Sequence, residues 1–323
     1  MGASGMSILI TGGAGFIGSH LVERFLTESD DKIVCLDNYN DYYDPAIKRK
    51  NVTAFENNPQ VTMVEETFCN QEAMHRLFAD CDITEVFHFG AYAGVRPSIE
   101  RPHLYQKANI EGTLCLLEAA RNKPVERFVM ASSSTVYGGG AEAPFKEDAS
   151  IGVPLSPYGA SKRAAELMGL TYHALHQVPV ICLRPFSIYG PRLRPDLAMT
   201  IFTAAILEGK PLPLFGDGSI RRDFTFITDF CDGVLATRTC PEAIGQCINL
   251  GHNHPVEIRR LIEILEDALG VKANIEHLDA VAGEMPVTHA DLSKAQQLLG
   301  YTPKFPLAEG VAEFVAWYRE IHR

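Results

Sequence analysis

The sequence predicts an α/β protein in which a doubly wound parallel sheet is joined to a smaller, mixed α/β C-terminal domain. Short apolar runs alternate with helical patterns over the first half of the chain, and this alternation produces a parallel sheet covered by helices on both faces. A glycine-rich segment directly follows the first apolar run. After residue 184 prolines and glycines become frequent and the alternation ends. We therefore expect one domain at 1–183 and a second at 184–323, with some segments of the second returning to the first.

The individual elements follow from the spacing of apolar residues. Short apolar runs predict strands at 7–11, 32–36, 61–64, 85–89, 127–131 and 180–183. Helical patterns predict helices at 16–28, 70–79, 104–122, 157–176, 257–269 and 307–321. The fourth of these helices has the clearest start, because Ser156 can cap it and Pro157 suits its first turn.

The composition is that of a globular protein and argues against several kinds of partner. The net charge of −11 disfavours nucleic acid. No apolar run approaches the ~20 residues of a membrane span and the N-terminus has no signal-peptide pattern, so we expect a cytoplasmic protein without membrane contact. The eight cysteines form no C-x-x-C pair and indicate free thiols. His252-Asn-His254 has no third ligand at a useful spacing, so we expect a polar turn there and no bound metal.

The segment Thr11-Gly-Gly-Ala-Gly-Phe-Ile-Gly18 has the spacing of a dinucleotide-binding loop in a Rossmann-type domain. It follows a predicted strand and opens a predicted helix, so the backbone can approach a pyrophosphate that the helix N-terminus faces. Asp37 ends the second strand, where an acid binds the adenine-side ribose and repels a 2′-phosphate, so NAD is favoured over NADP. The residues expected at the cofactor are Gly12, Gly15, Phe16, Ile17, Gly18, Asp37 and Asn38.

The run Tyr158-Gly-Ala-Ser-Lys162 is a candidate catalytic pair. On a helix the two side chains share one face, one turn apart. A free phenol has a pKa of about 10, and a nearby lysine ammonium favours the phenolate that accepts a proton. The same spacing also arises by chance in exposed helices. A third hydroxyl, that of Ser133, follows the predicted strand at 127–131, on the sheet edge where ligands of doubly wound proteins bind.

Together these features resemble the extended short-chain dehydrogenase/reductase family that acts on nucleotide sugars. The resemblance covers nearly the whole chain and is carried by the glycine loop, Asp37, Ser133, Tyr158, Lys162 and Arg222-Asp-Phe-Thr-Phe-Ile227. It implies that Tyr158 is the general base and that Ser133 hydrogen-bonds the reacting oxygen. It also implies that Lys162 binds the nicotinamide ribose of NAD and lowers the Tyr158 pKa, so both residues contact the cofactor.

The resemblance has two further implications. Asn109 is similar to the helix asparagine that backs the site in this family, although an ordinary helix cap or a surface amide is an equal alternative. Relatives pair through two helices, which here correspond to 104–122 and 157–176, so we expect a homodimer.

The residues after Ser133 discriminate among the epimerases, 4,6-dehydratases and decarboxylases of this family. Dehydratases carry an Asp-Glu pair before Val-Tyr-Gly and decarboxylases keep a glutamate there, whereas this chain has Ser134 and Thr135. Hydroxyls cannot do carboxylate acid/base chemistry at neutral pH, so dehydration is disfavoured and decarboxylation less strongly so. We expect epimerisation at C4, in which Tyr158 takes the hydroxyl proton while hydride passes to NAD and later returns to the other face of a transient 4-keto sugar.

The stretch from Leu183 to Asp196 predicts the sugar, because it is similar to the corresponding stretch of UDP-glucuronate 4-epimerases. The resemblance implies that Arg194 binds the sugar carboxylate, a pairing that suits a bidentate guanidinium. A solvated loop charge or a pyrophosphate contact is the alternative for this arginine. We expect conversion of UDP-glucuronate to UDP-galacturonate, with Arg222 at the pyrophosphate. The expected substrate-binding residues are Ser134, Thr135, Ser187, Arg194, Arg222, Arg96 and Glu284.

Other functions remain open on the sequence alone. Among enzymes these are a 4-epimerase of UDP-glucose or UDP-N-acetylglucosamine and a UDP-glucuronate decarboxylase. The alternative from another class is a non-catalytic, NAD-sensing scaffold of the same fold, which the presence of both Tyr158 and Lys162 disfavours.

Overall fold

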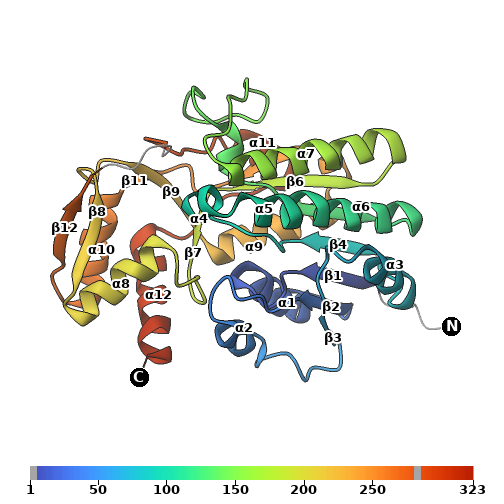
Figure 1. Ribbon diagram of the computed structural model, residues 1–323, viewed down its shortest axis with the longest axis horizontal. Coiled ribbons are helices and arrows are strands. Elements are labelled where there is room, and N and C mark those ends of the chain that lie inside the picture. The colour runs from blue at the N-terminus through green and yellow to red at the C-terminus, as the bar shows by residue number, and fades with distance from the viewer. Residues whose placement is uncertain (1–5, 280–284, 323) are drawn as a thin grey trace.

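The computed structural model describes residues 6–279 and 285–322. Its largest element is a seven-stranded parallel sheet with the order β10-β6-β5-β4-β1-β2-β3 (Figure 1). The predicted α/β class with a doubly wound sheet is confirmed. The strands of this sheet are β1 (Ser7–Thr11), β2 (Lys32–Asp37), β3 (Val61–Glu65), β4 (Glu85–His88), β5 (Arg127–Ala131), β6 (Val180–Pro185) and β10 (Cys247–Leu250).

Helices cover both faces of the sheet, because the side chains of each strand alternate between the faces. In β1, Ile8 and Ile10 belong to one apolar core and Leu9 belongs to the other. Helices α1 and α9 line the first core, and helices α3, α6 and α7 line the second. The helices of this part are α1 (Phe16–Glu28), α2 (Pro45–Val52), α3 (Gln71–Asp80), α4 (Val95–Glu100), α5 (Pro102–Tyr105), η1 (Gln106–Gly112), α6 (Thr113–Asn122), η2 (Ser134–Tyr137), α7 (Pro157–His176), α9 (Ile227–Ala236) and α11 (Ser293–Leu299).

The segment 104–122, which we expected as one α-helix, contains a π-helical stretch, η1, between α5 and α6. Gly112 ends this stretch beside Phe68, whose ring would lie 2.4 Å from a Cβ at that position, so only glycine allows this approach. Asn109 lies in the middle of the stretch and is 1% exposed. Single π turns inside helices widen the turn locally and are frequent at functional sites. Here the wider turn carries Asn109.

The C-terminal part contains two small sheets, a three-stranded sheet β11-β9-β7 and a pair β12-β8, on the left of Figure 1. One strand of this part of the chain, β10, instead extends the large sheet by pairing with β6. Among the described residues, no helix is long and apolar enough to cross a membrane. The elements of this part are β7 (Ser187–Tyr189), α8 (Ala198–Glu208), β8 (Pro211–Phe215), β9 (Arg221–Phe226), η3 (Thr237–Thr239), η4 (Pro241–Ala243), β11 (Pro255–Glu257), α10 (Ile258–Leu269), β12 (Asn274–Leu278) and α12 (Leu307–Ile321).

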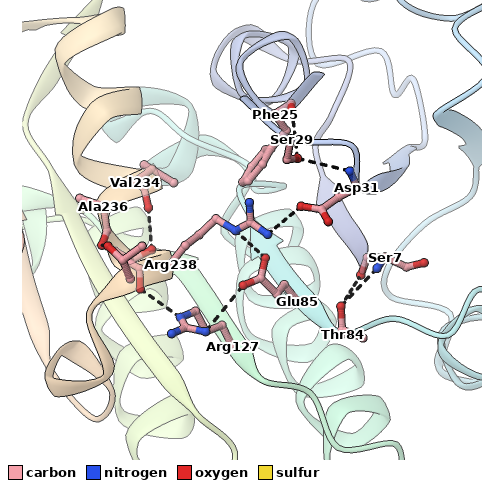
Figure 2. A network of polar contacts seen from close by, with 12 residues as sticks. Ser7, Phe25, Ser29, Asp31, Thr84, Glu85, Arg127, Val234, Ala236 and Arg238 are labelled. Atoms are coloured by element: carbon pink, nitrogen blue, oxygen red, sulfur yellow. Dashed lines mark hydrogen bonds and ion pairs between the residues drawn. The ribbon is translucent and has the colours of Figure 1, made fainter. Parts of the chain in front are cut away.

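A buried ion-pair network joins the segment after α9 to the amino ends of the central strands (Figure 2). Arg238 donates to Glu85 from Nε and to Asp31 from Nη2, both at 2.8 Å. Arg127 lies 3.7 Å from the same Glu85 carboxylate and donates to the Thr237 carbonyl at 3.1 Å. The Glu85 side chain is 2% exposed, and its burial raises its pKa although both arginines oppose the rise. The network therefore stabilises the charged form of Glu85, which burial alone would disfavour.

We expect Arg238→Gln to lower the free energy of unfolding by about 3 kcal/mol at pH 7.5, because it leaves the buried Glu85 carboxylate poorly paired. In the variant, the pKa of Glu85 in the folded state rises further above its value in the unfolded state. The folded state therefore tolerates a protonated Glu85 at low pH, and it loses stability as the pH rises and Glu85 becomes charged. The deficit should therefore shrink at pH 5. Urea unfolding at both pH values measures it. Arg24→Gln, which breaks the partly exposed pair with Glu28, serves as the control, and an Arg238 deficit that is equal at both pH values would contradict this account.

Candidate active site

The glycine loop connects β1 to the N-terminus of α1. Gly12 has a φ of +68°, and a Cβ there would lie 2.8 Å from the backbone of Gly90. A Cβ on Gly18 would lie 2.1 Å from the Gly12 carbonyl oxygen. Any side chain at these two positions would push the loop apart. Gly15 precedes α1 and forms no side-chain cap, so the first N–H groups of this helix are available to an anionic ligand.

Asp37 lies beside this loop at the carboxyl end of β2. Its carboxylate accepts hydrogen bonds from the backbone N–H groups of Ala14 at 3.3 Å and Tyr39 at 2.9 Å. Lys48, which is 5% exposed on α2, places its Nζ 3.5 Å from the same carboxylate. Burial lowers the pKa of Lys48, and Asp37 opposes that shift. Asn38 is exposed, and its side-chain oxygen accepts from the backbone two residues later, so it closes the next turn.

The hydroxyl of Ser133 lies at the carboxyl end of β5, directly before the short helix η2. It accepts hydrogen bonds from Thr135, from the backbone N–H at 3.2 Å and from Oγ1 at 2.9 Å. Its hydroxyl also acts on Tyr158 and lowers the pKa of that phenol. Ser134 is buried and Thr135 is partly buried in the same turn. The structure thus brings the serine segment and the candidate base into contact.

The phenol of Tyr158 is less acidic than we expected from its spacing to Lys162. Burial raises the Tyr158 pKa above its usual value, and this effect outweighs the Ser133 hydroxyl and the charge of Arg194, both of which lower it. Removing the phenolate from water costs more than these two neighbours return, and the lowering by Lys162 that the sequence implies stays a prediction.

Lys162 is buried one helical turn beyond Tyr158, with 5% exposure. Its Nζ donates to the carbonyl of Ala131 at 2.8 Å, which ties α7 to the end of β5. Burial lowers the pKa of Lys162 to about 8, and the carboxylate of Glu166 opposes this shift. Lys162 is therefore mostly protonated at neutral pH.

Asn109 fastens the backbone beside the site. Its side chain accepts from the N–H of Tyr92 and donates to the carbonyl of the same residue, each at 2.9 Å, and it donates to Ser161 Oγ at 2.9 Å. Ser161 lies on α7 between Tyr158 and Lys162. Asn109 is neither a helix cap nor a surface amide, and it connects the π-helical stretch, the loop after β4 and the helix of the candidate catalytic pair.

Arg194 lies near Tyr158, close enough for its charge to lower the pKa of that phenol. Its Nε and Nη2 donate to the two oxygens of Asp196 at 2.9 and 2.8 Å, and Nη2 also donates to the Ala93 carbonyl at 3.2 Å. The guanidinium lies 5.6 Å from the centre of the Tyr42 ring, and Tyr42 donates its hydroxyl hydrogen bond to the same Ala93 carbonyl. Three loops therefore meet at Arg194, whose side chain is partly buried at 17% exposure.

The other candidate substrate residues lie toward the C-terminal part. The Arg96 guanidinium stacks 4.0 Å from the centre of the Phe215 ring at the end of β8. Arg222, on β9, donates to the carbonyl of Met285 at 2.8 Å. Ser187 begins β7 and is partly buried. Glu284 lies outside the described residues.

The segment His252-Asn-His254 forms a turn around Asp223. The backbone N–H groups of His252 and Asn253 donate to the Asp223 carboxylate at 2.7 and 3.1 Å, and Asn253 has a φ of +60°. No group of three or more His, Cys, Asp or Glu side chains is placed to hold a metal ion within residues 6–279 and 285–322.

Several residues of the site escaped the sequence analysis. Lys48 and Tyr42 reach candidate site residues from other segments of the chain, whereas Asp196 and Glu166 lie close in sequence to Arg194 and Lys162. One local signal was available, since Asp44-Pro45 is a helix-start pattern and the Asp44 side chain caps α2, the helix of Lys48.

The described residues fit a dinucleotide with an unphosphorylated adenine-side ribose. The loop has no room for a Cβ at Gly12 or Gly18, the N-terminus of α1 is uncapped, and the buried Asp37 carboxylate stands at the end of β2. Phe16 is buried and Ile17 packs against the same core, so both fix the first turn of α1. Tyr158, Lys162 and Ser133 lie at the end of β5, on the same edge of the sheet.

Comparison with known proteins gives concordant results. The model of the NAD dependent epimerase/dehydratase family matches residues 8–251. A UDP-glucuronate 4-epimerase from Thermodesulfobacterium geofontis is 39% identical over 97% of this chain and 96% of its own length. The structure of a UDP-glucuronic acid 4-epimerase from Bacillus cereus, in complex with UDP-glucuronic acid and NAD, superimposes with a TM-score of 0.93 at 36% identity, covering 98% of this chain and all of that chain. A UDP-glucose 4-epimerase from Thermotoga maritima with UDP-glucose has a TM-score of 0.91 at 28% identity, covering 98% and 100%.

Proposed function

Because the chain belongs to the NAD-dependent epimerase/dehydratase family, we propose that it is an NAD-dependent 4-epimerase that interconverts UDP-glucuronate and UDP-galacturonate. The observation that carries this proposal is the partly buried Arg194 near Tyr158, together with a serine-threonine turn beside Ser133 that contains no carboxylate. A guanidinium in this place suits a uronate, and the hydroxyls of Ser134 and Thr135 suit hydrogen bonding to the same carboxylate.

In this proposal each residue has a defined task. The glycine loop and Asp37 hold NAD, and the chemistry that NAD supplies when bound is reversible hydride transfer at C4 of the sugar. Tyr158 accepts the proton of the 4-hydroxyl and later returns it, while Ser133 hydrogen-bonds the same oxygen. The charge of Lys162 favours the phenolate form of Tyr158.

The carboxylate of the substrate creates a chemical hazard that the site has to control. A 4-keto glucuronate is a β-keto acid, and it loses carbon dioxide when the bond to its carboxylate aligns with the carbonyl π system. Arg194, Ser134 and Thr135 hold the carboxylate out of that alignment in our proposal. Asp196 keeps the guanidinium in one place, because it binds Nε and Nη2 together.

The proposal is tested by incubating the purified protein separately with UDP-glucuronate, UDP-glucose and UDP-N-acetylglucosamine and following the anomeric protons by NMR. We expect UDP-galacturonate to appear from UDP-glucuronate and the neutral sugars to react much more slowly. Conversion of only the neutral sugars would assign the neutral-sugar 4-epimerase instead. A UDP-pentose would indicate the decarboxylase, and no reaction with NAD bound would favour the scaffold.

We also propose that the protein is a cytoplasmic homodimer that pairs through the segment 104–122 and α7. Two leucines on α7 are exposed, Leu167 at 50% and Leu175 at 69%, which is consistent with a covered apolar face. The eight cysteines are free thiols, as suits a reducing compartment. Light scattering on the purified protein should give twice the chain mass, and Leu167→Glu with Leu175→Glu should give the monomer mass.

A further inference from the structure

Glu166 stands out in the structure as a carboxylate that is fully buried, at 0% exposure, next to the candidate catalytic pair. It lies on α7 one turn beyond Lys162 and two turns beyond Tyr158. A buried carboxylate of this kind is rare unless it is paired and hydrogen-bonded. The proposed mechanism, as described so far, gives it no task.

The end of β5, the strand β6 and α7 itself supply the partners of Glu166. Ser132 at the end of β5 donates to Oε1 at 2.5 Å, and Arg184 on β6 donates to Oε1 from Nε at 2.8 Å and to Oε2 from Nη2 at 3.1 Å. Arg163, at the edge of the cluster, donates to Oε2 at 2.7 Å. Arg184 is 1% exposed, and its guanidinium lies 4.8 Å from the centre of the Tyr137 ring. All these partners hold the Glu166 carboxylate in one position.

The contacts of Lys162 and Glu166 together hold the end of β5. Lys162 binds the carbonyl of Ala131, and Glu166 binds the hydroxyl of the next residue, Ser132. Two side chains one turn apart on α7 thus hold two consecutive residues of the chain, and Ser133 follows immediately. The position of the Ser133 hydroxyl relative to Tyr158 therefore depends on this pair of contacts.

The titratable groups around Lys162 differ in whether they favour its charged form. His88 faces it from β4, but burial and Lys162 lower the pKa of His88 to about 3, so that ring is neutral above pH 5. Tyr158 is neutral below its raised pKa, and Arg184 faces Lys162 only across the Glu166 carboxylate. Among the groups that act on Lys162, Glu166 is the one that favours its charged form, against the burial that disfavours it.

We propose that Glu166 is a positioning residue of the reaction: its carboxylate balances the positive charge of Lys162 one helical turn away, and the two side chains together fix the strand end that presents Ser133. This inference rests on the proposed function for the roles of Lys162 and Ser133. Glu166 touches neither substrate nor cofactor in this assignment and acts through its two neighbours.

The test compares pH profiles of kcat/KM between pH 6 and 10.5 for the NAD-loaded protein and three variants. Lys162 acts in its protonated form, so activity falls as pH rises through its pKa. Glu166→Gln removes the negative charge, lowers that pKa and should move the alkaline fall about one pH unit or more toward neutral. Glu166→Asp keeps the charge but shortens the reach to Ser132, so it should lower kcat and leave the alkaline fall in place.

Arg76→Gln on α3 is the control, because it removes an exposed cation that pairs with Glu72 and does not bind Glu166, and its profile should follow the wild type. An alkaline fall of Glu166→Gln at the wild-type pH would overturn the proposal. If this variant does not fold, Glu166→Gln with Arg184→Met serves instead, since replacing both members of a buried ion pair is commonly tolerated.

Failure of the proposed function is recognised separately. If the wild type converts none of the UDP sugars, the proposed function is wrong. The protonation of Lys162 is then monitored through NAD binding, by measuring the pH at which NAD dissociates from the protein. Dissociation of NAD from Glu166→Gln about one pH unit below the wild-type value would still support the role of Glu166. Equal values for the two proteins would contradict it.

Discussion

Tyr158→Phe is expected to lower kcat with UDP-glucuronate by about 10²- to 10⁴-fold, the usual contribution of a positioned general base. The substitution removes one oxygen and leaves the ring, which packs edge-on against Tyr105 at 6.1 Å between centroids. The fold and the NAD loop are untouched by this change. The variant should therefore bind NAD and UDP-glucuronate normally and lose only the acceptor for the 4-hydroxyl proton.

Turnover is measured by NMR and the retention of NAD by the absorbance of the protein. The control is Tyr172→Phe on the same helix, whose hydroxyl donates to Glu118 away from the site. That variant should be as active as the wild type. A Tyr158→Phe protein within about tenfold of the wild type would mean that another group takes the proton.

Arg194→Ala is expected to change the product as well as the rate. Loss of a charged hydrogen-bonding partner should raise KM for UDP-glucuronate about 10- to 100-fold. The carboxylate of the 4-keto intermediate is then free to turn into alignment with the carbonyl, so carbon dioxide and a UDP-pentose should appear. Removing the Arg194 charge should also raise the Tyr158 pKa, because that charge lowers it.

Product composition by NMR and release of carbon dioxide measure this prediction. Arg192→Ala is the control, because Arg192 is two residues earlier and pairs with Glu23 and Ser19 on α1. It should give UDP-galacturonate alone. Slower turnover of Arg194→Ala with unchanged product purity would show that the arginine binds the substrate without restraining its carboxylate.

The sequence predicted the elements that depend on short-range signals. The six strands expected in the large sheet and the helices α1 and α7 lie where their apolar patterns placed them, and Ser156 caps α7 through the N–H of Gly159. The π-helical stretch was not predictable, because the clamp by Asn109 joins residues far apart in the chain. The small strands of the C-terminal part escaped because they are short, and β8 contains two prolines.

The candidate site also combines residues that the sequence predicted with features that it did not. Its motif residues, such as Tyr158 and Ser133, were found because a resemblance links them to known chemistry. The raised pKa of Tyr158 was not found, because burial depends on the complete tertiary structure. Glu166 has no sequence signal beyond its place in the helix predicted at 157–176, because its partner Arg184 lies 18 positions away on β6.

The origin of β10 has a consequence for how the chain folds. This strand comes from residues 247–250 and pairs with β6, which is otherwise the edge of the large sheet. During synthesis the sheet cannot be completed until more than 60 residues after β6 have left the ribosome. Until then β6 presents an unpaired edge that is apolar from Val180 to Leu183, the kind of surface on which chains aggregate. A fragment cut at the apparent domain boundary would keep that edge permanently, so the two halves of this chain are best regarded as one folding unit.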